Sequence, residues 1–115
     1  MTGPLSTSRW KTARSFPRFA VDLPLQVKRA QQTGTLQCRT VDIGLGGLCG
    51  ATGSEILPVG ERVQLMFALA RDGPEIAVTA KVRYSLPPRH GFQFLNLSPE
   101  QRERIRHACE ALTIV

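Results

Sequence analysis

Apolar and polar residues alternate with a period of two along most of the chain. In the segment 19–29, FAVDLPLQVKR, one face collects Phe19, Val21, Leu23, Leu25 and Val27. The segments 35–43, 61–71, 75–85 and 90–97 alternate in the same way, and turn signals such as TG at 33–34 and RDGPE at 71–75 separate them. A period of two indicates strands, and short strands at this spacing predict a small antiparallel β-barrel.

Two details of the first strands bear on their placement. Pro24 has no N–H to donate to a neighbouring strand, so it predicts that the segment 19–29 is an edge strand. In the segment 35–43, strict alternation predicts that Asp42 shares one face with Cys38 and Thr40, while Ile43 lies on the other face.

The period changes near the C-terminus. Ser98, Pro99 and Gln101 have the pattern of a helix start, with an N-cap serine, a proline at the first position and a capping box. Ile105, Ala108, Cys109 and Leu112 then form one apolar stripe. We expect an all-β fold with one C-terminal helix over residues 99–112 that closes one end of the barrel.

The net charge of +6 is concentrated in the first third of the chain. Residues 1–39 contain one acid, Asp22, and seven basic residues: Arg9, Lys11, Arg14, Arg18, Lys28, Arg29 and Arg39. Residues 40–115 contain eight residues of each sign. We interpret residues 1–18 as a flexible basic arm and residues 19–115 as the barrel domain. The arm indicates an anionic partner or, alternatively, only a solubilising tail.

Several function classes are not expected. His90 and His107 lack carboxylates or cysteines at ligand spacing, which argues against a metal site. No nucleophile and base pair or carboxylate pair stands out, so an enzyme is not expected. Three widely spaced cysteines, with no signal-peptide pattern and no long apolar run, predict a cytoplasmic protein without membrane insertion.

The stretch VDIGLGGLCG at 41–50 is rich in glycine. It is not a dinucleotide fingerprint, because Cys49 stands at the third glycine position, and no Gly-Lys-Ser/Thr follows that would make a P-loop. The glycines provide either positive φ or a close backbone approach between two strands. Asp42, at the mouth of this loop, has the carboxylate that the N1–H and N2–H₂ donors of guanine require.

A second candidate element is RSFPR at 14–18. Arg14 and Arg18 are four residues apart in a non-helical arm, and Pro17 stiffens the spacer. Guanidinium groups bind phosphate through two hydrogen bonds and also stack on flat purine rings. Together with Asp42, the pair indicates a purine nucleotide, although two arginines alone are equally consistent with a solvated surface.

The order and spacing of these elements resemble the PilZ domain, the bacterial receptor for the second messenger cyclic di-GMP. Arg14-x-x-x-Arg18 precedes the first strand, Asp42-x-Gly44-x-x-Gly47 follows the second, and the last strand and helix complete a likeness from about Lys11 onward. The resemblance implies a six-stranded antiparallel barrel capped by one helix. It also implies that Arg14 and Arg18 bind the phosphates and guanines, that Asp42 bonds a guanine edge, and that Gly47 lets the loop approach the base.

The chain departs from the family pattern at Gly44, which stands where the family has serine. The missing hydroxyl removes one hydrogen bond, a loss of about 0.5–1.5 kcal/mol or roughly three- to tenfold in affinity. Ala13 replaces an arginine that accompanies a stacked ligand dimer, which favours one ligand molecule per domain. Trp10 and Arg83 are further candidate ligand contacts, with packing on the barrel rim and a solvated strand face as their respective alternatives.

The resulting hypothesis is a cytoplasmic cyclic di-GMP effector or adaptor, without a further cofactor. Its arm closes over the nucleotide, and it signals in trans to a protein of motility, biofilm or other regulation. The alternative is a degenerate PilZ protein that does not bind the nucleotide and acts only through protein contacts. A third reading is a nucleic-acid-binding barrel, which the scarcity of aromatic residues such as Trp10 and Tyr84 opposes.

Overall fold

Six antiparallel strands close into a barrel in the computed structural model, which describes residues 17–111 and 113–114. The strands are β2 (Phe19–Arg29), β3 (Thr35–Ile43), β4 (Gly47–Ala51), β5 (Arg62–Ala68), β6 (Glu75–Leu86) and β7 (Arg89–Leu95). Their order is β3-β4-β7-β6-β5-β2, and pairing of β2 with β3 closes the ring. The helix α2 (Pro99–Cys109) and the short strand β8 (Thr113–Ile114) follow. The fold class expected from the sequence is therefore confirmed.

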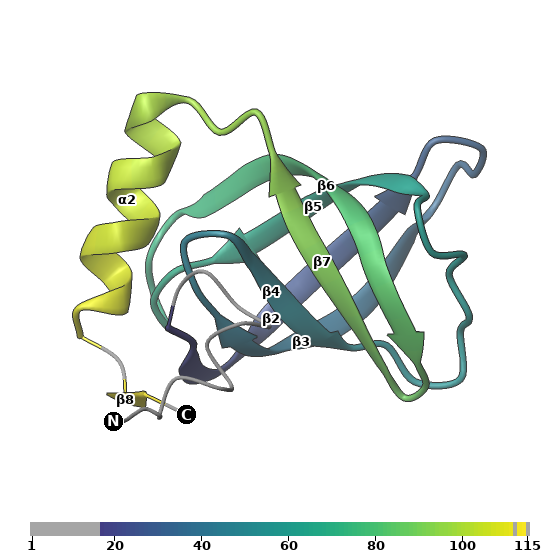
Figure 1. Ribbon diagram of the computed structural model, residues 1–115, viewed down its shortest axis with the longest axis horizontal. Helices are drawn as coiled ribbons and strands as arrows, with labels where there is room; N and C mark the ends of the chain where they lie inside the picture. The colour runs from purple at the N-terminus through teal and green to yellow at the C-terminus, as the bar shows by residue number, and fades with distance from the viewer. Residues whose placement is uncertain (1–16, 112, 115) are drawn as a thin grey trace, which may run out of the picture.

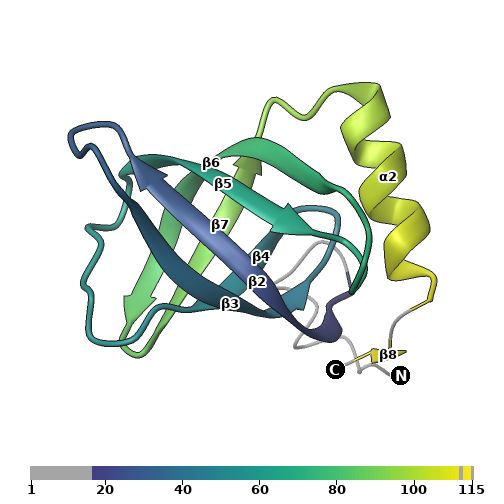
Figure 2. The same ribbon diagram turned by 180° about the vertical axis from the view of Figure 1, so that it is seen from behind.

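The barrel has two different ends. Figure 1 shows α2 lying across one end, while the β2–β3 hairpin and the long β4–β5 connection lie at the other. Seen from behind in Figure 2, β2 crosses the barrel wall between β3 and β5. The strand β8 pairs with Phe19 and Ala20, at the start of β2.

The interior is filled by alternate residues of the strands, as the period of two predicts. The largest fully buried side chains are Phe67, Phe92, Leu25, Leu48, Leu57, Leu65, Ile105, His90, Val27, Val78 and Val82. The rings of Phe67 and Phe94 stack with centroids 6.0 Å apart. Burial of each apolar side chain in this list stabilises the fold by about 1.5–3 kcal/mol, which makes this core the main source of stability.

The prediction of an edge strand from Pro24 is wrong for β2 as a whole. β2 pairs with β3 along most of its length and with β5 from Leu25 to Arg29. Pro24 is paired with Arg39 of β3 but precedes the stretch that pairs with β5. The proline thus occupies a position where its missing N–H costs no hydrogen bond on the second side.

The register between neighbouring strands shifts at three places, one of them between Ala20 and Leu23 in the β2–β3 pair. The β3–β4 register shifts between Thr40 and Asp42, and the β6–β7 register shifts between Val82 and Tyr84. As a result Thr40 and Ile43 are both buried, whereas Asp42 is on the outer side. The expectation that Asp42 shares a face with Thr40 is therefore wrong, because an extra residue in one strand reverses the facing of all that follow.

The helix begins as predicted and ends earlier. Ser98 Oγ accepts from the Gln101 N–H at 3.0 Å, and Gln101 Oε1 accepts from the Ser98 N–H at 2.9 Å, which is a complete capping box. Ile105 and Cys109 bury the apolar face against the barrel. The helix ends at Cys109 and not at residue 112, because the chain tightens into a turn in which the Ala111 N–H donates to the Ala108 carbonyl.

A buried histidine holds the barrel end opposite α2. His90 is fully buried, and its Nε2 accepts the backbone N–H of Leu57 at 3.0 Å. Since a backbone N–H can only donate, Nε2 is unprotonated, and Nδ1 carries the proton toward Thr52 Oγ1 at 2.6 Å. Burial lowers the pKa of His90 from its ordinary value of 6.5. The neutral ring therefore ties the β4–β5 connection to β7.

We expect the free energy of unfolding to reach its full value above about pH 7 and to decrease as the pH falls through 6.5. In that range the unfolded chain takes up a proton at His90 that the folded chain does not accept, so protons favour unfolding. Urea titrations between pH 7.5 and 5.5 measure how the free energy of unfolding changes with pH. Ordinary carboxylates titrate below this range and do not contribute to the change.

The exposed His107 offers a matched control. The variant His107→Ala should keep the pH dependence, and His90→Gln should lose it. A wild-type stability that is flat over this range would contradict a neutral, hydrogen-bonded His90.

Candidate functional site

An ion pair joins Arg18, the residue directly before β2, to Asp42 near the end of β3. Arg18 Nη1 lies 2.6 Å from Asp42 Oδ1, across 24 positions of sequence, and the two side chains are 20% and 15% exposed. Arg18 directly precedes β2, and β2 pairs with β3 so that Ala20 stands opposite Asp42. The bulge in β3 turns Asp42 outward to meet the arginine. A charge-assisted bond of this kind is shorter and stronger than a neutral one.

The glycine turn between β3 and β4 depends on close backbone approach. The Gly44 N–H donates to the Gly47 carbonyl at 2.9 Å, and the Gly46 carbonyl accepts the Phe94 N–H at 2.9 Å. A Cβ at Gly47 would lie 2.0 Å from the Phe92 carbonyl oxygen. Of the two functions expected for these glycines, the structure shows the close approach: the described glycines with positive φ are Gly53 and Gly60.

Gly44 makes room for the chain that leads into β2. A Cβ at this position would meet the Pro17 carbonyl oxygen at 2.6 Å and the Arg18 Cδ at 3.1 Å. The segment Pro17–Arg18 thus lies directly on the glycine turn, which places the guanidinium beside Asp42. Any side chain at position 44 requires this segment to move.

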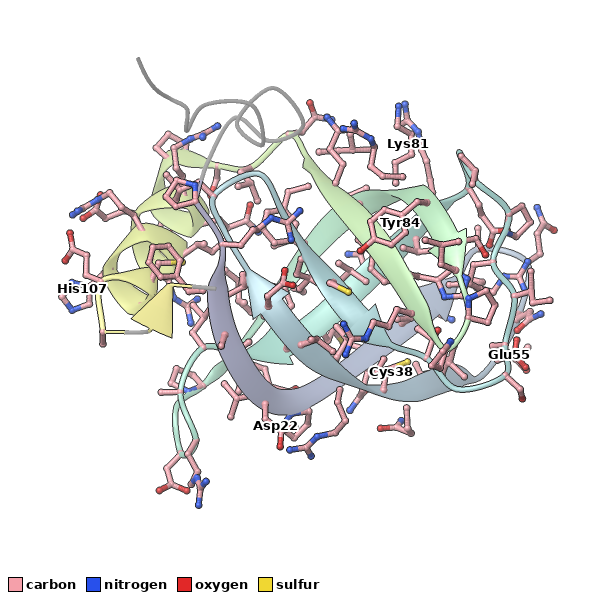
Figure 3. All side chains as sticks on the ribbon, turned by 60° about the horizontal axis from the view of Figure 1, so that its bottom comes forward. Asp22, Cys38, Glu55, Lys81, Tyr84 and His107 are labelled. Atoms are coloured by element: carbon pink, nitrogen blue, oxygen red, sulfur yellow. The ribbon has the colours of Figure 1, made fainter. Side chains whose placement is uncertain are left out.

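Strand pairing extends the site across the outer wall of the barrel. Asp42 is paired with Cys49 of β4, Cys49 with Gly91 of β7, and Gly91 with Tyr84 of β6. The Tyr84 hydroxyl donates to Cys49 Sγ at 3.4 Å. Burial, followed by the contact with Cys49, raises the pKa of Tyr84 to about 12, so the phenol stays protonated. Figure 3 shows Tyr84 and Lys81 on this wall.

The family assignment rests on a match that spans most of the chain. The PilZ domain family matches residues 12–111. The chain belongs to the PilZ domain family. PilZ domains are receptors for cyclic di-GMP, and the match indicates no catalytic family. Comparison with curated proteins gives no match.

Solved PilZ structures have the same fold. The PilZ domain of YcgR from Escherichia coli with c-di-GMP has a TM-score of 0.71 at 22% identity, over 86% of this chain and 90% of that one. YcgR from the same organism in complex with c-di-GMP gives 0.67 at 26% identity, over 82% and 43%. The Bacillus subtilis inhibitor of motility MotI/DgrA gives 0.70 at 16% identity, over 84% and 49%.

The structure brings together part of the predicted PilZ site. Arg18, Asp42, Gly44 and Gly47 lie around the turn between β3 and β4. Arg83 is exposed on β6, separated from Asp42 by β7 and β4. The remaining candidates, Trp10 and Arg14, lie outside the described residues, as does Ala13.

Sequence reasoning missed the part of this wall beyond β4. Tyr84, Cys49 and Gly91 join it through strand pairing and through the bulge in β6. The sequence does show that Tyr84 and Gly91 flank one turn. It does not show the bulge that pairs these two residues, because no residue type identifies a bulge at this position.

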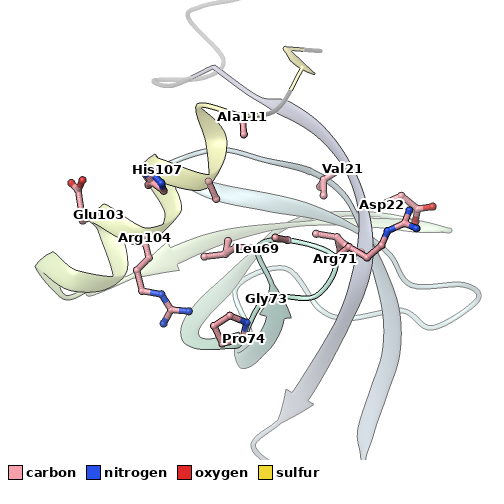
Figure 4. Close-up of a pocket in the computed structure, with 13 residues that line it drawn as sticks. Val21, Asp22, Leu69, Arg71, Gly73, Pro74, Glu103, Arg104, His107 and Ala111 are labelled. Atoms are coloured by element: carbon pink, nitrogen blue, oxygen red, sulfur yellow. The ribbon is translucent and has the colours of Figure 1, made fainter.

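The PilZ motif residues form an open wall rather than a cavity. A hollow of about 920 Å³ lies elsewhere, between α2, the start of β2 and the β5–β6 turn (Figure 4). Val21, Leu69 and Pro74 line it, and none of the four motif residues above does. Within residues 17–111 and 113–114, no helix is long and apolar enough to cross a membrane, and no three potential ligand side chains gather for a metal ion.

The close contact at Gly47 predicts a strong effect of the smallest substitution. Gly47→Ala should destabilise the fold by about 1–3 kcal/mol, because its methyl group would force β4 away from the Phe92 carbonyl. Gly34→Ala is the control, since nothing lies within 4 Å of a Cβ there, and it should change stability by no more than about 0.5–1 kcal/mol. Urea unfolding of both proteins measures the difference. Equal stability of the two variants would contradict the approach described for β4 and β7.

Proposed function

We propose that this PilZ protein binds cyclic di-GMP at the turn between β3 and β4 and signals to a partner protein in trans. The observation that carries the proposal is the 2.6 Å contact of Arg18 with Asp42. It joins the second arginine of the RxxxR motif to the acid of the second motif, beside Gly44 and Gly47. Likeness to YcgR with c-di-GMP supports the choice of ligand.

The chemistry of the pair suits a guanine nucleotide. A carboxylate offers several lone pairs, and the ion pair uses Oδ1 of Asp42. In the proposed complex the other lone pairs accept the N1–H and N2–H₂ donors of guanine, which no adenine presents in that arrangement. Arg18 then directs its remaining N–H groups to the phosphate or the guanine acceptors, and Arg14 joins it from the arm.

The output follows from closure of the arm over the ligand. The contacts of the two arginines with the nucleotide exist only in the closed state, so the ligand shifts the population toward it. Residues 9–18 then present a different surface to a protein partner. The likeness to an inhibitor of motility supports a partner protein that takes part in motility. The buried, unpaired thiols Cys38, Cys49 and Cys109 are consistent with action in a reducing cytoplasm.

Isothermal titration calorimetry with cyclic di-GMP tests the proposal. We expect saturable binding by the wild type and a loss of at least tenfold in affinity for Arg14→Ala and for Asp42→Asn, since each removes a charged partner of the ligand. Arg62→Ala, an exposed arginine of β5, is the control and should bind like the wild type. Absence of heat from the wild type and from the Gly44→Ser variant described next would overturn the proposal.

Position 44 separates the sensor from its alternative, a PilZ protein blind to the nucleotide. Gly44→Ala adds the Cβ that meets Pro17, and Gly44→Ser adds the same Cβ with a hydroxyl. We expect Gly44→Ala to bind more weakly than the wild type, and Gly44→Ser to bind about three- to tenfold more tightly than Gly44→Ala. Binding by Gly44→Ser together with a silent wild type would establish the nucleotide-blind alternative.

A further inference from the structure

Tyr84 lies flat on the outer wall with one ring face available. A Cβ at Gly91 would come within 2.1–2.7 Å of three atoms of the ring, so the ring rests directly on the β7 backbone. The side chain reaches toward Cys49, which is only 3% exposed, yet Tyr84 itself is 40% exposed. One face of the ring is therefore covered by the strand, and solvent reaches the other.

A β-bulge determines the direction of both Tyr84 and Asp42. Val82 is buried, so strict alternation would point Tyr84 inward as well. The bulge between Val82 and Tyr84 turns it outward instead, as the bulge between Thr40 and Asp42 turns Asp42 outward. Asp42 and Tyr84 therefore belong to one row of paired residues that runs across four neighbouring strands. Only Cys49 and Gly91 lie between them in this row. Such bulges are common where a side chain is directed into a site.

Distance along this row fits one planar ligand. The Tyr84 hydroxyl is 3.4 Å from Cys49 Sγ, and Cys49 is the residue paired with Asp42. The ring therefore ends beside β4, the strand next to the one that carries Asp42, and neighbouring strands lie roughly 4.8 Å apart. A base whose edge faces the Asp42 carboxylate would lie over Cys49 and against the exposed face of the Tyr84 ring, which itself covers Gly91.

We propose that Tyr84 is a stacking platform for the guanine whose edge Asp42 binds. This inference rests on the proposed function and extends it, since the carboxylate reads the edge of the base while the ring holds its face. Stacking of a base on an aromatic ring is tolerant of base identity, so Asp42 supplies the selectivity and Tyr84 adds affinity.

A purely structural role makes a different prediction. An aromatic ring over a glycine also shields the backbone of a strand pair, and for that purpose an aliphatic side chain of similar size serves as well. Stacking requires a planar ring. Tyr84→Leu keeps an apolar cover over Gly91 without the plane, and Tyr84→Phe keeps the plane without the hydroxyl that contacts Cys49.

The first test is calorimetry with cyclic di-GMP on these two variants. We expect Tyr84→Leu to lose about 5- to 150-fold in affinity and Tyr84→Phe to stay within roughly threefold of the wild type. Wild-type affinity in Tyr84→Leu would overturn the stacking role while leaving the proposed function intact. A silent wild type would refute the proposed function, and this inference with it.

The second test needs no substitution at Tyr84 and therefore does not depend on the folding of a variant. Tyr84 is the only tyrosine of the chain, so protein labelled with 3-fluorotyrosine gives a single fluorine resonance. Cyclic di-GMP should shift this resonance in proportion to the saturation measured by calorimetry on the same sample. At a ligand concentration near the wild-type dissociation constant, labelled Asp42→Asn protein should show a much smaller shift. Binding heat in the labelled wild type without a shift would show that the base does not stack on Tyr84.

Discussion

The bulge in β3 is the constraint on which the rest of the site depends. If residues 40–43 followed a regular strand without the bulge, Asp42 would share the inner face with Thr40 and Ile43 would point outward, so the carboxylate would enter the core unpaired. Burial of such a charge is far too costly for a barrel this small. The extra residue keeps Ile43 inside and brings Asp42 to Arg18. Core packing and the candidate ligand site are thus served by the same irregularity.

Much of the fold was predictable because the strands obey the period of two. The segments 19–29 and 35–43 coincide with β2 and β3, and the start of α2 was marked by Ser98 and Gln101. β4 was not recognisable by its pattern, because GLCGA has three small residues and is buried throughout apart from its end. The bulges were not predictable either, since Val41 and Arg83 fit a regular strand equally well. The residue motifs led to Arg18 and Asp42, whereas Tyr84 joins them only through register.

Gly44 has a second effect besides the loss of the serine hydroxyl. In this structure its missing Cβ is the space into which the Pro17 carbonyl fits. With serine at this position, Pro17 and Arg18 would have to lie farther from the turn. The glycine at position 44 and the short Arg18–Asp42 contact thus belong to one arrangement, in which Pro17 and Arg18 lie directly against the turn.

The pairing of β8 with Phe19 and Ala20 joins two distant parts of the chain at one point. The strand that follows α2 is bonded to the residues directly after Arg18. A group attached directly after β8, whether a fluorophore, an affinity tag or another domain, would therefore start close to Arg18. A dye placed there would be well situated to report on the proposed nucleotide site, and a bulky fusion there would be poorly chosen for testing the proposed binding.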